Sequence, residues 1–201
     1  MAEKIRAYLE VGDKRTFASA ADWPGWSRSG KDPHSCIETL AAYAPRYEKV
    51  ADLAGFDLPL EADYEVIEKI KGNATTDFGA PGVPMKDEFK PRTKAQIERE
   101  IALLEACWKY LDQVRAEVPE ELRKGPRGGG RDREKMYQHV VDAEMGYAPA
   151  IGLKMKTHDR KALLEALRHP AKDTKWPVTY AIRRIAWHAL DHAWEMEDRI
   201  P

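Results

Sequence analysis

The chain has 201 residues, of which 43% are hydrophobic, and its formal net charge is −1. This composition predicts a packed core and argues against the strongly basic face that nucleic-acid binding requires. No apolar run approaches the roughly 20 residues of a membrane span, and the first residues lack the apolar core of a signal peptide. The two cysteines, Cys36 and Cys107, form neither a disulfide framework nor a Cys-x-x-Cys motif, so we expect a cytoplasmic protein.

Three segments near the N-terminus have the patterns of β-strands. Residues 5–11 alternate apolar and polar side chains with the period of two that is typical of a half-buried strand. Residues 16–20 follow a Gly-Asp-Lys turn and are predicted to form the second strand of a hairpin. Residues 62–70 alternate again and predict a third strand.

A loop and a helix separate the hairpin from this third strand. Residues 22–30 contain a Pro-Gly pair and are predicted to form a loop, whose two tryptophans anchor it on the core. Asp32 and Pro33 form a pair that is typical of an N-cap and a first helical turn. The helix that they open carries apolar residues at helical spacing as far as Gly55, which ends it.

The remaining chain has the pattern of a helical bundle. Thr93 and Gln96 form a capping box, and the apolar residues behind them recur at steps of four and three until Pro119. Three further helices are expected: one from Asp132 until Pro149 disturbs it, one over residues 159–168 and one from Pro177 to Pro201. The predicted fold class is therefore α+β and mostly α.

The predicted domain organisation follows from these elements. Residues 1–72 form a small ββαβ module, and residues 93–201 form a four-helix bundle. Residues 73–92 are rich in glycine and proline and are predicted to be a linker or a loop draped over the surface.

Two histidines on the last helix are the strongest functional signal. His188 and His192 are four residues apart, so both rings leave the same face of the helix and can share one divalent ion. His139 is the best candidate for a third ligand, because three of the residues that share its helical face, Ala143, Gly146 and Ala150, are small and would leave space beside the ring. Three neutral histidines hold a divalent ion and leave positions open for water or substrate. The alternative is that these histidines are hydrogen-bonded core residues. His34, His158 and His169 are assigned to the surface.

This histidine pattern resembles that of the DinB/YfiT-like superfamily of metal-binding four-helix bundles. His139 matches the histidine on that family's second helix, and His188 with His192 matches its His-x-x-x-His pair on the fourth. The helix order over residues 93–201 also agrees. The resemblance implies a metal-assisted enzyme that activates a thiol or water for transfer, isomerisation or hydrolysis of a small molecule, with a low-molecular-weight thiol as one cofactor. All-nitrogen ligation suits zinc, nickel, iron or copper and does not select among them.

Three carboxylates are candidates for roles around this ion. Glu195 lies on the metal face and is a fourth ligand or the catalytic base, or else it pairs with Arg199 on the next turn. Asp142 lies one turn after His139 and is a second candidate for catalysis. Asp191 is expected to orient an imidazole by a hydrogen bond to the ring nitrogen that does not bind the metal.

Two further residues are candidates for substrate binding. Arg184, one turn before His188, can hold an anionic substrate, and Tyr147 is the second candidate. A glycine-rich segment from Gly125 to Arg131, which includes Arg127, is either an anion-binding lid near the site or a solvated connector, and its composition favours the connector.

The N-terminal module resembles the HicB-like ββαβ module in its order of elements and in its Trp-Pro-Gly-Trp loop. HicB antitoxins use such a module to bind a toxin, usually beside a DNA-binding segment that this sequence lacks. We therefore expect a structural or substrate-covering role. The alternative function for the chain is a non-catalytic binding protein that uses this module, in which Trp23 and Trp26 matter more than the metal.

An apolar stripe on the last helix predicts a second packing partner. Trp187, Leu190 and Trp194 lie away from the histidine face, and a helix that is apolar on two sides needs two partners. We expect contact between the two modules, a homodimer, or both. The other expected partner is a small-molecule substrate, with no nucleic acid or membrane.

Overall fold

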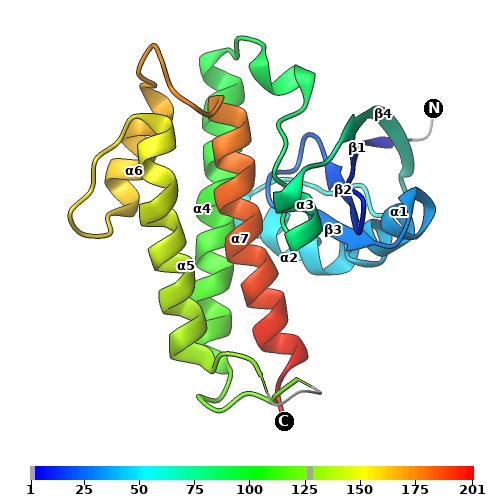
Figure 1. Ribbon diagram of the computed structural model, residues 1–201, viewed down its shortest axis with the longest axis vertical. Coiled ribbons are helices and arrows are strands. Elements are labelled where there is room, and N and C mark those ends of the chain that lie inside the picture. Colours follow the sequence, from blue (N-terminus) through cyan, green and yellow to red (C-terminus); the bar gives the residue numbers. More distant parts are fainter. Residues whose placement is uncertain (1–2, 126–128) are drawn as a thin grey trace.

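The computed structural model describes residues 3–125 and 129–201. Within these residues the fold is α+β, as predicted, with one four-stranded sheet and seven α-helices. Three long helices lie alongside one another: α4 (Lys94–Glu117), α5 (Arg133–Tyr147) and α7 (Val178–Asp198). The sheet and the helices that accompany it lie on the far side of α7 and α4 from α5 (Figure 1).

The sheet confirms the predicted hairpin and the predicted third strand. Its strands are β1 (Lys4–Val11), β2 (Thr16–Ala20), β3 (Ser27–Gly30) and β4 (Asp63–Lys71), in the order β3-β2-β1-β4. β1 pairs antiparallel with β2 and parallel with β4, and β2 pairs antiparallel with β3.

The predicted loop over residues 22–30 is wrong in its second half, where β3 forms. This strand is short and polar, so it lacks the apolar alternation by which a strand is recognised in sequence. Cross-strand contacts hold it instead, because Ser27 Oγ donates to Ser19 Oγ over 2.6 Å and the Ala20 N–H donates to the Trp26 carbonyl over 2.9 Å.

The first half of the segment is a loop whose tryptophans anchor it, as predicted. Trp26 is fully buried, stacks on Tyr47 with ring centroids 5.2 Å apart and donates to the Leu40 carbonyl. Trp23 is 8% exposed. Both rings therefore belong to the core, and the alternative function stays a prediction.

The helix predicted from Pro33 to Gly55 is in fact two helices, α1 (Pro33–Ala42) and α2 (Ala44–Ala54). Its predicted ends are confirmed, since Asp32 caps the Ser35 N–H over 3.0 Å and Gly55 ends α2 at φ +77°. The break falls at Tyr43 because Pro45 has no N–H to continue the ladder of hydrogen bonds.

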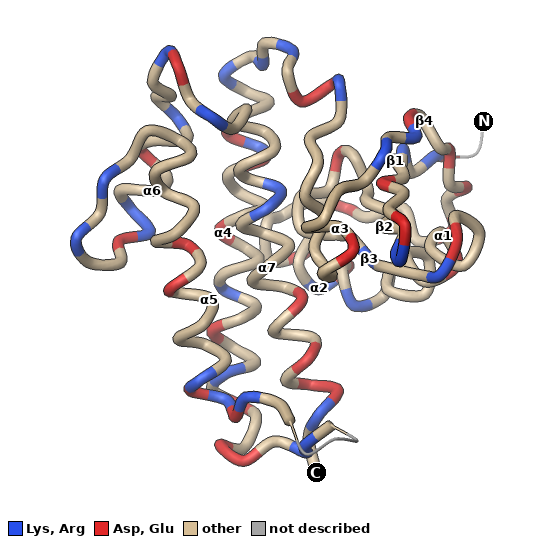
Figure 2. The backbone as a smooth tube through the Cα atoms, in the orientation of Figure 1, with Lys and Arg blue, Asp and Glu red and all other residues tan. Residues whose placement is uncertain are grey.

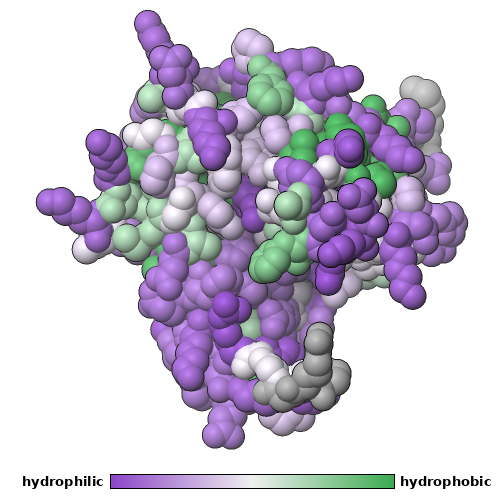
Figure 3. Space-filling model, viewed as in Figure 1, coloured by the Kyte–Doolittle hydropathy of each residue, from purple (hydrophilic) through white to green (hydrophobic). Residues whose placement is uncertain are grey.

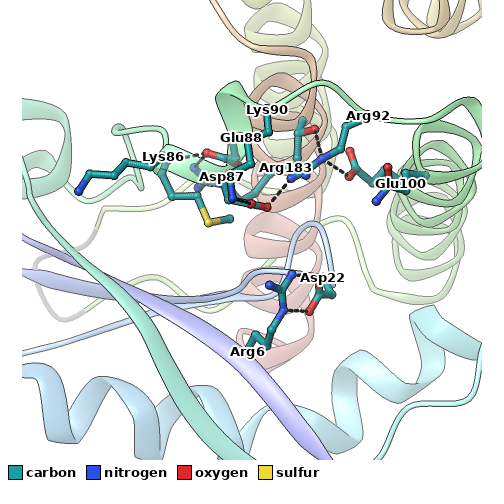
Figure 4. A network of polar contacts seen from close by, with 12 residues as sticks. Arg6, Asp22, Lys86, Asp87, Glu88, Lys90, Arg92, Glu100 and Arg183 are labelled. Carbon is teal, nitrogen blue, oxygen red and sulfur yellow. Dashed lines mark hydrogen bonds and ion pairs between the residues drawn. The ribbon is translucent and has the colours of Figure 1, made fainter.

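The segment 73–92 packs against both parts of the chain. It contains α3 (Ala74–Phe78) and a 3-10 turn, η1 (Lys86–Phe89). The N–H groups of Gly82 and Val83 donate to the carboxylate of Glu10 on β1, over 2.9 and 3.1 Å. From η1, Glu88 accepts two hydrogen bonds from Arg183 of α7, of 2.6 and 2.9 Å (Figure 4). The segment is therefore the draped loop among the two alternatives, and it ties the sheet to α7.

The helical part keeps the predicted order of helices. Thr93 caps α4 as predicted, and a 3-10 turn, η2 (Ala148–Ile151), follows α5 at Pro149. The next helix, α6 (Arg160–Arg168), has nine residues and is much shorter than α4, α5 and α7. The specific four-helix arrangement of the DinB-like family stays a prediction.

The expected contact between the two predicted modules is confirmed. Trp194 of α7 lies edge-on to Tyr43 with ring centroids 5.0 Å apart, and Trp187 lies edge-on to Phe17 at 6.1 Å. One hydrophobic cluster runs from the sheet through α2 and α4 to α7. The N-terminal elements thus cover the apolar stripe, and a homodimer stays a prediction.

Acidic and basic residues are interspersed along the backbone in every part of the fold that Figure 2 shows. Hydrophobic residues gather on the viewed face over β4 and α3 (Figure 3), where Val66, Ile67 and Phe78 are 46%, 38% and 89% exposed. Both cysteines are free and buried. Among the helices of the described residues, none has the length and apolar composition that crossing a membrane needs.

Candidate metal centre

His188 and His192 leave α7 on one face, as their spacing predicts. Their Nε2 atoms are 3.2 Å apart, and their ring centroids are 4.7 Å apart. Both side chains lie in the interior, since the residues are 6% and 9% exposed. A tetrahedral zinc site with Zn–N bonds of about 2.0–2.1 Å separates its ligand nitrogens by about 3.3–3.4 Å. The pair is therefore already at a distance that suits two ligands of one ion.

His139 of α5 completes the cluster. Its ring centroid lies 5.0 Å from that of His188 and 5.0 Å from that of His192. One ring nitrogen from each of the three histidines can be chosen so that all three atoms lie within 4.8 Å of one another. The structure thus brings together the three predicted ligands, and their all-imidazole chemistry fits a divalent transition metal.

The sequence of α5 explains how His139 reaches this position. Met136 and Val140, three residues before and one after it, are buried and seat the helix in the bundle. His139 itself is half-buried, on the more accessible side of the cluster. A Cβ added at Gly146, two turns further on, would meet nothing within 4 Å. Gly146 is exposed, so this open space is solvent, and the space predicted beside the His139 ring stays a prediction.

The protonation of the cluster suits metal binding. Burial, and then the neighbouring imidazoles His192 and His139, lower the pKa of His188 to about 2. Burial is also the largest cause that lowers the pKa of His139. Both rings are therefore neutral at pH 7, which is the form that binds a metal.

Glu195 holds His192 from the side opposite the cluster. Its Oε2 lies 2.9 Å from His192 Nδ1, and its Oε1 accepts a hydrogen bond of 2.8 Å from Arg199. The hydrogen bond with His192 is the largest cause that lowers the pKa of Glu195, so the group is a carboxylate. A carboxylate at Nδ1 places the proton there and leaves Nε2 with its lone pair free. Pairing with Arg199 is thus confirmed, and the roles of fourth ligand and base stay predictions.

Asp191 does not have the contact predicted for it. Its carboxylate accepts a hydrogen bond of 3.0 Å from Arg28 of β3, whose guanidinium lies over the Tyr43 ring. The second carboxylate, Asp142, is exposed and accepts a hydrogen bond of 2.8 Å from Gln138. Among the described residues it is Glu195, and not Asp191, whose carboxylate contacts an imidazole of this cluster. The catalytic role of Asp142 stays a prediction.

The two predicted substrate residues lie on the His188 side of the cluster. The Tyr147 ring centroid is 6.0 Å from that of His188. The guanidinium carbon of Arg184 lies 5.5 Å from the Tyr147 centroid and 4.7 Å from that of Trp187.

Sequence reasoning missed two aromatic residues at this end of the site. Trp176 packs against Tyr147 with ring centroids 5.2 Å apart. Trp187 was assigned to the stripe facing away from the histidines, yet its ring centroid is 5.8 Å from that of His188 while its edge also meets Phe17. A helical wheel separates the two faces by Cα direction, whereas an indole is broad enough to contact both.

The surface assignment is wrong for one of the other histidines. His34 and His169 are exposed, but His158 is half-buried and lies 2.5 Å from the fully buried carboxylate of Glu144. The Trp108 indole also donates to Glu144, over 2.6 Å. A buried carboxylate needs such donors, so His158 serves the core of the bundle.

Part of the candidate anion-binding lid, residues 126–128 with Arg127, lies outside the described residues. Arg131 at its end is exposed, and its charge contributes to the lowered pKa values of His139 and His188. Both alternatives, lid and connector, stay open.

Comparison with known proteins adds no relative to this picture, because no protein family, curated sequence or solved structure matches the chain. The resemblances to DinB/YfiT-like and HicB-like proteins therefore stay predictions, and the case for function rests on the histidine cluster itself.

Proposed function

We propose that the protein is a metal-dependent enzyme of the DinB-like type, which binds one divalent transition metal through His139, His188 and His192 and acts on a small molecule. The observation that carries this proposal is the approach of three imidazole nitrogens, from two helices, to within 4.8 Å of one another. A bound ion of this kind polarises a carbonyl or lowers the pKa of a water or thiol.

The chain's own residues would prepare the site in two ways. Glu195 fixes the ring of His192 with Nε2 turned toward the other histidines. Burial keeps His188 neutral, so its lone pair is available at pH 7. Three protein ligands leave further coordination positions for a water or a substrate.

Any thiol used in the reaction would come from outside the chain. Burial raises the pKa of Cys36 to about 11 and also raises the pKa of Cys107, so neither is a thiolate at pH 7. The reaction classes that we propose are therefore transfer or isomerisation with a low-molecular-weight thiol, or hydrolysis with water.

Elemental analysis tests the proposal most directly. Purified protein is incubated with zinc, nickel and iron salts, desalted and analysed beside a His139→Ala/His192→Ala variant and a control, His34→Ala/His169→Ala, that removes two exposed histidines. We expect about one equivalent of metal in the wild type and the control, and none in the first variant. Absence of metal from all three proteins would contradict the proposal, and the histidines would then be core residues.

A further inference from the structure

Arg184 is a buried cation without an acidic partner. The residue is 8% exposed, and in the described part of the chain it takes part in no ion pair. Its Nη1 is buried and has no hydrogen-bond partner there. The preceding residue, Arg183, is equally buried, but its guanidinium donates two hydrogen bonds to Glu88. Arg183 Nη1 also lacks a hydrogen-bond partner in the described residues, so the two neighbours differ in that Arg183 has a carboxylate partner and Arg184 has none.

The aromatic rings around Arg184 stabilise only part of this group. Tyr147 and Trp187 lie within 5.5 and 4.7 Å of the guanidinium carbon, which is the range of a cation–π contact. Such rings meet the flat face of the guanidinium, whereas its N–H bonds point outward in the plane. Burial raises the pKa of Tyr147, whereas a hydrogen bond with Arg184 is among the influences that lower it, so the Tyr147 hydroxyl is one acceptor. Nη1 still lacks an acceptor in the described residues, and its burial without one is unfavourable.

Two further polar atoms in the same helical turn also lack a partner. Trp187 Nε1 and His188 Nδ1 are both buried without a hydrogen bond in the described residues. Whether His188 Nδ1 carries a proton depends on whether its Nε2 holds a metal or contacts His192, so this atom is not counted in the anion subsite. One turn of α7 therefore holds two buried donors without a hydrogen-bond partner in the described residues, Arg184 Nη1 and Trp187 Nε1, and a positive charge without a carboxylate. Donors and charge of this kind match an anion.

We propose that Arg184 binds the carboxylate of a small carboxylic acid substrate, whose reacting end reaches the histidine cluster. The planar guanidinium fork suits a carboxylate, which it can hold through two parallel hydrogen bonds. Side chains four residues apart on a helix have Cβ atoms about 5–6 Å apart. The anchored carboxylate therefore lies about one turn from His188, so only a few bonds separate it from the reacting atom. This inference rests on the proposed function for its reaction, but the anion subsite itself is independent of the metal.

The test uses the metal-free protein, with succinate and acetate as probes and the uncharged diamide succinamide as the control ligand. Tryptophan fluorescence reports on Trp176 and Trp187, and the melting temperature gives a second readout at constant ionic strength. The variants are Arg184→Met and Arg184→Lys. The matched control is Arg99→Met, since Arg99 also lies over aromatic rings, 4.7 Å from Trp23, but outside the site.

We expect the wild type and Arg99→Met to bind a carboxylate saturably and to give no response to succinamide. The carboxylate affinity should fall at least tenfold in Arg184→Met and by a smaller factor in Arg184→Lys. Without ligand, Arg184→Met should melt at or above the wild-type temperature, because it removes an unpaired charge. A melting temperature as low as that of Arg183→Met would overturn the proposal by showing that Arg184 already has a partner. Three other results would also overturn the proposal. They are no response of the wild type to a carboxylate, a carboxylate response that Arg184→Met leaves unchanged, and a response to inorganic phosphate but to no carboxylate.

Separate zinc titrations distinguish this outcome from failure of the proposed function. Zinc binding that survives in Arg184→Met, while carboxylate binding is lost, supports both proposals. Carboxylate binding in a protein that binds no metal would retain the anion subsite and remove the metalloenzyme.

Discussion

Glu195 joins His192 to Arg199. One carboxylate oxygen lies 2.9 Å from the His192 Nδ1, and the other accepts a hydrogen bond of 2.8 Å from Arg199 near the end of α7. His192 and Glu195 lie one turn apart on α7, and Arg199 directly follows its last residue, so the backbone aligns the three side chains. This relationship gives His192 one tautomer and one ring orientation, which is what a metal ligand needs.

Replacing Glu195 should therefore weaken the metal site without unfolding the protein. We expect Glu195→Gln to lower zinc affinity by about 10–100-fold, because the neutral amide no longer enforces the tautomer of His192. Isothermal titration with zinc measures this change. Glu165→Gln is the control, since Glu165 also lies about one helical turn from a histidine, His169, but on the surface. Equal zinc affinity in Glu195→Gln and the wild type would exclude the orienting role.

The stability of the metal-free protein should fall in mild acid because of His188. In the unfolded chain this residue binds a proton below its ordinary pKa of about 6.5, whereas in the folded protein its pKa is lowered to about 2. The contribution is thus fully present above pH 6.5 and is lost as the pH falls toward 2. At pH 5 the loss from this one residue amounts to about 2 kcal/mol.

Urea denaturation at pH 7.5 and pH 5 measures this dependence. His188→Gln should show a smaller loss of stability between the two pH values than the wild type, whereas His169→Gln, at an exposed position, should show the same loss as the wild type. An unchanged pH dependence in His188→Gln would mean that His188 is not held neutral in the fold.

The three ligand positions could be predicted because the spacing of residues along a helix is local. His188 and His192 share a face in any α-helix, and the small residues on one face of α5 single out His139 as the third ligand. The contact of Asp191 could not be predicted in the same way. It depends on Arg28, which reaches α7 from a strand that the sequence pattern does not reveal.

The interior polar groups show the same limit. Adjacent arginines on α7 look alike in sequence, yet Arg183 meets Glu88 from a segment 95 residues away, and Arg184 meets no carboxylate in the described residues. Similarly, His158 has the polar flanks of a surface residue, and only the fold brings it to Glu144. Helical periodicity predicts which face a residue occupies, whereas its partner depends on tertiary contacts.

The buried ion pair between Arg183 and Glu88 should be needed for stability. The pair is almost fully buried and bidentate (Figure 4), so Arg183→Met leaves a buried carboxylate without its charge partner. We expect the free energy of unfolding to fall by about 3–5 kcal/mol. Urea denaturation measures the change, and Arg183→Met/Glu88→Gln should recover part of it.

A second bidentate pair in the same view supplies the control. Arg6 and Asp22 are each about half exposed, so Arg6→Met should cost about 0–1 kcal/mol. Equal costs for Arg183→Met and Arg6→Met would show that η1 is not held against α7 as the structure has it. The segment 73–92 would then be the flexible linker of the sequence prediction.

The contact between the N-terminal loop and α7 should tolerate no side chain at Gly25. This residue has φ +93°, and a Cβ there would lie 2.9 Å from Leu190 Cδ1 and 3.2 Å from the Ala186 Cβ. Gly25→Ala therefore adds a steric clash to the backbone strain of a positive φ, and we expect it to cost about 2–4 kcal/mol. Gly55→Ala isolates the backbone part, because Gly55 has φ +77° with nothing within 4 Å of an added Cβ, and it should cost about 1–2 kcal/mol. Urea denaturation of both variants gives the difference. If Gly25→Ala lowers the free energy of unfolding no more than Gly55→Ala does, the loop can move away from α7. A larger loss at Gly25 would show that the N-terminal loop packs closely against α7, the helix that carries His188 and His192.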